Sequence, residues 1–363
     1  MKKSILALFL AGMIALSGCS TMLERDYFVS HTYDPVSSAG IGGSALRAEN
    51  YQDLLSAVLH IVARGEETGV IALYNYNAKD VEDHLTRACL EVVQEDPLGS
   101  YAVDYIRHDY SLIVSYYEVH LQIAYRRPPE QIASIVSVTG SSALRQELRR
   151  ALVGFKPSTV LRVSYFTEDE AYIRDLVTQA YYDAPSAALG KPEVTVSLYP
   201  DSGYQRIVEI GLTFPEAPET LLQRSQELKQ HVASITPKLT TYTQLRDILL
   251  NNCYVVGDAK KNTAYDALLN KEANHEGLAL AYQLLCDQTD LPCMVVQGEL
   301  NGEPHYWNII QVRQEYRHVD LSAGLFSLTG EEITAAGAYT WDSTIYPATN
   351  PTTETSPIPT QEN

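Results

Sequence analysis

The chain has 363 residues and is acidic, with 45 Asp and Glu residues against 27 Lys and Arg, a formal net charge of −18. An acidic surface repels phosphate groups, so this balance argues against a nucleic-acid partner. The length predicts two or three domains rather than one.

The first residues predict a secretory signal. Lys2 and Lys3 precede a short apolar stretch, residues 5–15, and the sequence LSGC ends at Cys19. The stretch is too short for a typical membrane span. Small residues before a cysteine resemble a bacterial lipobox. That resemblance implies cleavage of the signal peptide, residues 1–18, a lipid on Cys19, and a protein anchored to a membrane on its extracytoplasmic face. The alternative is an ordinary signal peptide with an incidental cysteine.

Two further segments lack the apolar residues that a packed domain needs. Residues 19–48 contain SSAGIGGS and are predicted to form a tether behind the lipid. Residues 348–363 are predicted to form a disordered tail, because Ile358 is their one large apolar residue.

Between these segments, a helix–strand–helix–strand–strand pattern occurs twice. In the first unit, residues 49–135, we expect helices at 51–63 and 79–93 and strands at 69–76 and, as a pair, within 101–128. In the second unit, residues 136–235, we expect helices at 143–155 and 169–184 and strands at 158–166, 193–200 and 204–215, followed by a connector helix at 215–235. The two units predict an αβαββ duplication.

Neither repeat contains a recognisable catalytic motif. Their histidines are scattered, and no glycine-rich phosphate loop is present. The tyrosines, Tyr182 among them, lie at strand or helix ends and are expected to pack in the core or at its rim. A face that binds carbohydrate or peptide is the alternative.

Residues 236–347 carry the motifs that indicate chemistry. HEGLALAYQ is expected to begin a helix at His275, LPCMVVQGEL and HYWNIIQV are expected to be strands, and YRHVDLS ends a third strand at Asp320. Together these segments resemble the bacterial transglutaminase-like superfamily, whose core is papain-like. The expected fold is therefore α+β, with two tandem αβαββ units followed by a transglutaminase-like domain.

The resemblance also implies where a catalytic site would lie. The family uses a cysteine thiolate at a helix N-terminus, a histidine base on a strand, and an aspartate that orients the histidine. His305 matches the base and Asp320 the orienting residue. Trp307 and Asn308 match residues that shape the histidine strand. The resemblance implies no metal or other cofactor.

The nucleophile position departs from the family, because His275, followed by Glu276, stands where the cysteine is expected. The remaining cysteines, apart from the predicted lipidation site, all lie elsewhere: Cys89, Cys253, Cys286 and Cys293. Thiol catalysis is therefore predicted to be absent. Cys286 and Cys293 are the best candidates for a disulfide, and free thiols are the alternative.

His275 allows four interpretations. The first is a non-catalytic domain that binds a peptide or a cell-surface polypeptide, with Glu276, Trp307 and Asn308 in its cleft. The others are a hydrolase or acyltransferase that uses His275, a metal site formed by His275, His305 and Asp320, and a structural remnant without a ligand. We expect the first, in a lipid-anchored binding or scaffolding protein whose partners are the membrane and an envelope polypeptide.

Overall fold

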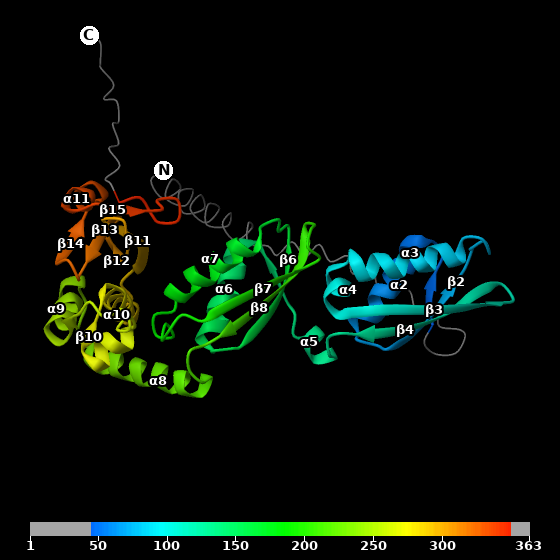
Figure 1. Cartoon of the computed structure of the whole chain (residues 1–363), viewed down its shortest axis with the longest axis horizontal. Coiled ribbons are helices and arrows are strands. Elements are labelled where there is room, and N and C mark those ends of the chain that lie inside the picture. The colour runs from blue at the N-terminus through cyan, green and yellow to red at the C-terminus, as the bar shows by residue number, and fades with distance from the viewer. Residues whose placement is uncertain (1–44, 350–363) are drawn as a thin grey trace, which may run out of the picture. The chain divides into compact units, whose positions relative to one another are not determined.

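The computed structural model describes residues 45–349, which have an α+β fold (Figure 1). The predicted signal peptide, Cys19, most of the predicted tether and nearly all of the predicted tail lie outside the described residues. Within 45–349, no helix is both long enough and apolar enough to cross a bilayer.

The chain forms two compact units. Within the described residues, the first comprises 45–142 together with 160–167 and 198–208, and the second comprises 143–159, 168–197 and 209–349. The division passes through the second predicted repeat. The predicted domain boundaries at 135 and 235 therefore stay predictions.

The first repeat is built on a four-stranded sheet. Its elements are β1 (Leu46–Ala48), α2 (Tyr51–Ala63), β2 (Thr68–Leu73), α3 (Val81–Gln94), α4 (Pro97–Ala102), β3 (Val103–Ile113) and β4 (Tyr116–Tyr125). The strand order is β1-β2-β4-β3, with β1 parallel to β2 and the other neighbours antiparallel. Residues 46–48 were predicted to belong to the tether. That prediction is wrong for these residues, because β1 pairs with β2 and Ala48 is fully buried.

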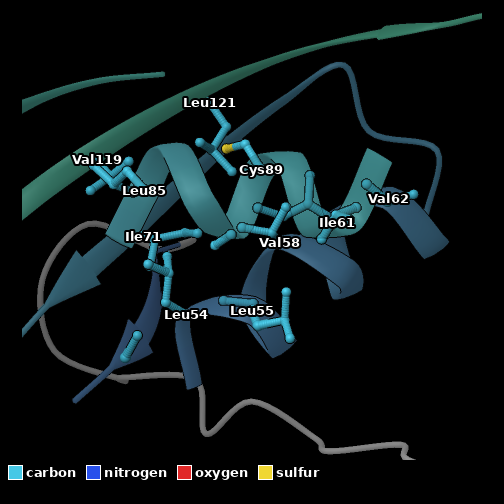
Figure 2. Packing of buried hydrophobic residues seen from close by; sticks show 14 of the residues in the cluster. Leu54, Leu55, Val58, Ile61, Val62, Ile71, Leu85, Cys89, Val119 and Leu121 are labelled. Carbon is cyan, nitrogen blue, oxygen red and sulfur yellow. The ribbon is translucent and has the colours of Figure 1, made fainter. Parts of the chain in front are cut away.

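Apolar side chains from both helices and from the sheet form the core of this repeat (Figure 2). Leu54, Val58 and Ile61 come from one face of α2, as the spacing of apolar residues predicts. They meet Leu85 and Cys89 of α3 and side chains of β2 and β4. Asn50 begins α2, because its side chain accepts a hydrogen bond from the Asp53 amide at 3.0 Å.

The second repeat has the same strand order and, apart from the short helix α4 of the first repeat, the same element order. A short α5 (Pro129–Ala133) leads into β5 (Val136–Thr139), α6 (Gly140–Val153), β6 (Ser158–Ser164), α7 (Glu170–Tyr182), β7 (Glu193–Tyr199) and β8 (Gln205–Thr213). Its sheet has the order β5-β6-β8-β7, with β5 parallel to β6, as β1 is to β2. The predicted duplication is confirmed, and each copy has one additional edge strand before its first helix.

The remaining elements surround a five-stranded antiparallel sheet. They are α8 (Pro218–Ile235), α9 (Tyr242–Asn252), β9 (Tyr254–Val255), the π-helix η1 (Asp266–Asn270), β10 (Glu272–Ala273), α10 (His275–Gln288), β11 (Cys293–Leu300), β12 (Glu303–Val312), β13 (Glu315–Asp320), β14 (Leu325–Leu328), α11 (Gly330–Ala336) and β15 (Tyr339–Trp341). The strand order is β14-β13-β12-β11-β15. The buried Trp307 and Tyr339 lie in the core beside this sheet.

One residue of the predicted tail belongs to this folded region. Thr349 is buried, and its hydroxyl lies 2.9 Å from Nε2 of His318. The prediction of disorder from residue 348 is therefore wrong at Thr349, because a buried histidine supplies its side chain with a hydrogen-bond partner. Residues 350–363 lie outside the described part of the chain.

Candidate functional site

The N-terminus of α10 holds the first residue of the candidate site. Asn274 begins the helix, because its Oδ1 accepts hydrogen bonds from the amides of Glu276 and Gly277. Gly277 allows the helix to pack tightly, since a Cβ at that position would lie 2.9 Å from the carbonyl oxygen of Lys261. The start of α10, which carries His275, therefore packs closely against the backbone at Lys261.

His305 on β12 and Asp320 at the end of β13 form a hydrogen-bonded pair. Nε2 of His305 lies 2.6 Å from Oδ2 of Asp320. The same Oδ2 accepts a hydrogen bond from the Tyr339 hydroxyl at 2.7 Å, and Oδ1 accepts three from Ser322 and Ala323. Burial opposes ionisation of Asp320, but these hydrogen bonds outweigh it and lower the pKa of the carboxyl. An ionised Asp320 thus orients His305 so that Nδ1 carries the ring's lone pair.

His275 lies directly against His305. The two ring centroids are 4.5 Å apart, and the rings are tilted by 33°. Nδ1 of His275 accepts a hydrogen bond from the backbone amide of Tyr306 at 3.2 Å. Burial, and after it the neighbouring His305, lowers the pKa of His275. His275 is therefore a neutral imidazole at neutral pH, with its proton on Nε2.

Trp307 and Asn308 hold the histidine strand in place. The Asn308 side-chain amide donates to the carbonyl of Ala279 at 2.9 Å, which joins β12 to α10. The indole of Trp307 donates to Nδ1 of His318 at 2.9 Å, and a Cβ on Gly298 would lie 2.5 Å from that indole ring. Both residues are buried, and these hydrogen bonds join β12 to α10 and to β13. Their predicted role in binding stays a prediction.

Glu276 is likewise buried and makes its polar contacts within the protein. It is 6 % exposed, and its carboxylate accepts from the Tyr182 hydroxyl at 2.6 Å and from the Asn262 amide at 3.2 Å. The ammonium group of Lys191 lies 3.1 Å from the same carboxylate and 3.1 Å from the Tyr306 hydroxyl. Burial alone would lower the pKa of Lys191, but Glu276 and Tyr306 outweigh it and raise that pKa.

The second repeat therefore contributes to the site, which the sequence did not predict. Tyr182 ends α7, and its ring stacks on Tyr306 with centroids 5.4 Å apart. Tyr306 in turn stacks on His275 at 5.6 Å. The rings of Tyr182, Tyr306, His275 and His305 thus follow one another. Tyr182 lies 94 positions before Glu276, and no spacing rule connects residues so far apart.

Tyr182 also lines a cavity of about 230 Å³. Its lining comes from α6, from the end of α7 and the residue after it, from β11 and from the segment after β15. The residues are Arg145, Gln179, Tyr182, Asp183, Met294, Val295, Gln297, Ile345, Tyr346 and Pro347. Arg145 and Asp183 form a two-pronged ion pair, at 2.5 and 2.7 Å, so the charges at its edge compensate each other.

No thiol takes the place of the missing nucleophile among the described residues. Cys89, Cys253, Cys286 and Cys293 are all free thiols. Burial raises the pKa of Cys253 to about 11 and that of Cys89 to about 12, which disfavours the thiolate. Cys286 lies near the opposite end of α10 from His275, roughly 16 Å along the helix. Within residues 45–349, no three His, Cys, Asp or Glu side chains are arranged to hold a metal ion.

Comparisons with known proteins show only distant likenesses. No family model and no curated protein matches the chain. Three similar solved structures are a candidate cysteine protease from Cytophaga hutchinsonii (TM-score 0.24, 11 % identity, 36 % of this chain and 62 % of that one), a protein described as a TGase (0.25, 12 %, 47 % and 52 %) and a candidate protease from Parabacteroides distasonis (0.22, 10 %, 69 % and 39 %).

The chain spans less than two thirds of each of these proteins. Their descriptions name the enzyme classes that the sequence resemblance suggests. TM-scores this low, however, do not establish a shared fold, and identities near one residue in ten carry no functional assignment. The chemistry of this chain must therefore be inferred from the arrangement of His275, His305 and Asp320.

The buried His318 predicts a specific dependence of stability on pH. Burial lowers the pKa of His318 from 6.5 to about 4, so below pH 6.5 the unfolded chain takes up a proton that the folded chain does not. His318 should therefore destabilise the fold progressively as the pH falls from 6.5 to 4, by about 3 kcal/mol in all. The comparison is urea unfolding of the wild type and of His318→Gln, which offers an acceptor to Trp307 and a donor to Thr349 but does not titrate. The stability of the wild type relative to the variant should fall by about 3 kcal/mol between pH 6.5 and pH 4. A pH-independent difference would contradict the buried neutral imidazole.

Proposed function

We propose that the chain is a lipid-anchored extracytoplasmic protein whose C-terminal domain is transglutaminase-like but non-catalytic. In this proposal the domain binds a peptide or a polypeptide of the cell surface and acts as a binding or scaffolding module. The sequence resemblance, the His305–Asp320 pair and the lipobox-like LSGC ending at Cys19 support it.

The observation that carries the non-catalytic part is the hydrogen bond from the Tyr306 amide to Nδ1 of His275. An imidazole acts as nucleophile or general base through an unprotonated ring nitrogen. The Tyr306 amide occupies the lone pair on Nδ1, and Nε2 then carries the proton. His275 thus offers an N–H donor and no free lone pair, although His305 is oriented as a base would be.

The same arrangement suits the binding of a peptide. A protonated Nε2 can donate a hydrogen bond to a backbone carbonyl, which every peptide supplies. The stacked rings of Tyr182 and Tyr306 provide a rigid aromatic wall beside it. The 230 Å³ cavity that Tyr182 lines has room for a side chain.

A working hydrolase or acyltransferase is the second candidate. The neutral state of His275 favours it, because burial and His305 lower its pKa and a neutral imidazole is the nucleophilic form. Such an enzyme would have to break the bond from Tyr306 or move the proton from Nε2 to another group. Turnover of an acyl substrate such as p-nitrophenyl acetate, abolished by His275→Ala, would favour this candidate over ours.

The proposed anchor predicts that cells incorporate a fatty-acid analogue into the protein. Because the thiol of Cys19 would carry the lipid, Cys19→Ala should abolish the label, whereas Cys89→Ala should leave it intact. In-gel detection after metabolic labelling measures this. Equal labelling of the wild type and Cys19→Ala would show that Cys19 is not lipidated.

Restoring the nucleophile tests the alignment of the site. In His275→Cys a thiol would lie at the N-terminus of α10 beside a histidine oriented by Asp320, and both features lower a thiol pKa. The new thiol should react with iodoacetamide at mildly acidic pH at least tenfold faster than the four native thiols. Peptide mapping by mass spectrometry resolves the sites.

The matched control is His275→Cys combined with His305→Ala, which keeps the helix but removes the base. Its new thiol should lose most of the added reactivity. If the single and double variants alkylate at the same rate, His305 and position 275 do not work as a pair, and the alignment to the family's catalytic site fails.

Peptide binding can be tested without knowing the natural ligand. A display library of random heptapeptides is selected against the immobilised wild-type chain, and enriched peptides are measured by fluorescence polarisation. His275→Phe keeps the aromatic stack but removes the Nε2–H donor, so it should weaken binding by about tenfold. Peptides that bind the variant as well as the wild type, or a library without any enrichment, would argue against a peptide-binding cleft.

A further inference from the structure

Strands β3 and β4 of the first repeat form a long hairpin (Figure 1). The side chains at its tip are apolar and exposed. Ile113 pairs with Tyr116, so Val114 and Ser115 alone form the loop. Leu112 is 63 % exposed and Val114 is fully exposed. Among the described residues, nothing covers these large apolar side chains.

The backbone makes this choice of residues costly. Val114 has a φ of +49°, in the left-handed region. A two-residue hairpin loop with such a φ favours glycine or asparagine, and a β-branched residue is strained there. A valine at this position therefore helps neither the turn nor the solubility of the tip.

The second repeat provides an internal comparison. Its sheet has the same strand order, and β7 and β8 are likewise joined by a hairpin turn. The connection is Pro-Asp-Ser-Gly-Tyr, residues 200–204, in which ordinary turn residues are followed by one exposed aromatic residue, Tyr204, and no aliphatic residue is present. The shared fold thus does not require aliphatic residues at the tip. The apolar residues 112–114 therefore need an explanation that applies to the first repeat alone.

The surroundings of the tip resemble those of a membrane-contacting loop. Residues 110–117, YSLIVSYY, carry no charge, although the chain as a whole has a net charge of −18. Tyr116 stacks on Tyr74 at 5.1 Å, and Tyr110 packs edge-on against Tyr117 at 6.0 Å. Tyrosines behind an apolar apex are the residues that favour the headgroup region of a bilayer. Asp109 and Glu118 flank this stretch, and Glu118 pairs with Ser111 across the hairpin, so the uncharged part that can meet a surface is the apex at residues 112–115.

We propose that the apex of this hairpin, residues 112–114, inserts shallowly into the interfacial layer of a lipid bilayer. A narrow apex with apolar side chains suits a fluid that adapts to it better than a shaped protein groove. The expectation that the tip lies near a membrane in the cell rests on the proposed lipid on Cys19. The assay below does not depend on that lipid. Roughly 25 residues separate Cys19 from β1, so a fully extended tether reaches at most about 90 Å. An anchor of that length would keep the tip at a high effective concentration near the membrane.

The test uses the chain from Ser20 to Asn363, which lacks both the apolar leader and Cys19 but keeps every described residue. Flotation with phosphatidylcholine vesicles should recover the protein with the lipid. Leu112→Ser combined with Val114→Asn should weaken the partitioning by about tenfold or more, because it removes the apolar apex. Asparagine tolerates a left-handed backbone, so the thermal unfolding midpoint of this variant should stay the same or rise. A loss of binding cannot then be attributed to misfolding.

Tyr204→Asn is the matched control, because Tyr204 is 72 % exposed beside the corresponding turn of the second repeat. This variant should float as well as the unsubstituted chain. Three outcomes would overturn the proposal: no flotation of the unsubstituted chain at any lipid concentration, equal flotation of the double variant, or a dimer in size-exclusion chromatography that the double variant abolishes without any vesicle binding. Because the assay lacks Cys19, its failure is separate from failure of the lipid-labelling test.

Discussion

The seating of the buried helix α10 on β12 is the constraint on which the candidate site depends. The residues from Glu276 to Cys286 are all buried, so the helix has essentially one position in which it can pack. Gly277 permits the close approach at its start, and Asn308 ties its backbone to the histidine strand. The ring of His275 is brought against His305 as a consequence of this packing. The packing of α10 thus places any side chain at position 275 beside His305.

Electrostatics then decides what the site can do. Asp320 is 1 % exposed yet ionised, because five hydrogen bonds converge on its two oxygens. Such a carboxylate keeps His305 in one orientation, which is the costly part of preparing a base. His275 is held differently, because the Tyr306 amide donates a hydrogen bond to the one lone pair of its ring, on Nδ1. Asp320 thus engages Nε2 of His305, whereas the Tyr306 amide engages Nδ1 of His275.

The parts of this structure that sequence patterns predict are those with a local signal. The helices and central strands of both repeats follow from apolar periodicity, and the alternation along β12 places His305 and Trp307 on one face of the strand. The edge strands β1 and β5 escape prediction because three or four residues are too few to show a period. Tyr182 and Lys191 escape it for another reason. Their contacts with Glu276 and Tyr306 depend on tertiary packing between residues far apart in the sequence, and a tyrosine that positions a site has the same local pattern as one that fills a core.

The duplication also explains why the two repeats can carry different tasks. Both copies satisfy the same packing rules, so residues outside their cores are free to differ. In the second copy, the end of α7 and the following loop supply Tyr182 and Lys191, which hold the buried Glu276 at the start of α10. In the first copy, the exposed apolar residues lie at the β3–β4 turn, where the second copy has Asp201 and Gly203. A carboxylate buried at a helix start needs fixed donors, whereas the membrane contact that we propose for the first copy would need only an uncharged apolar apex. One scaffold can meet both demands because each involves residues that its own core does not use.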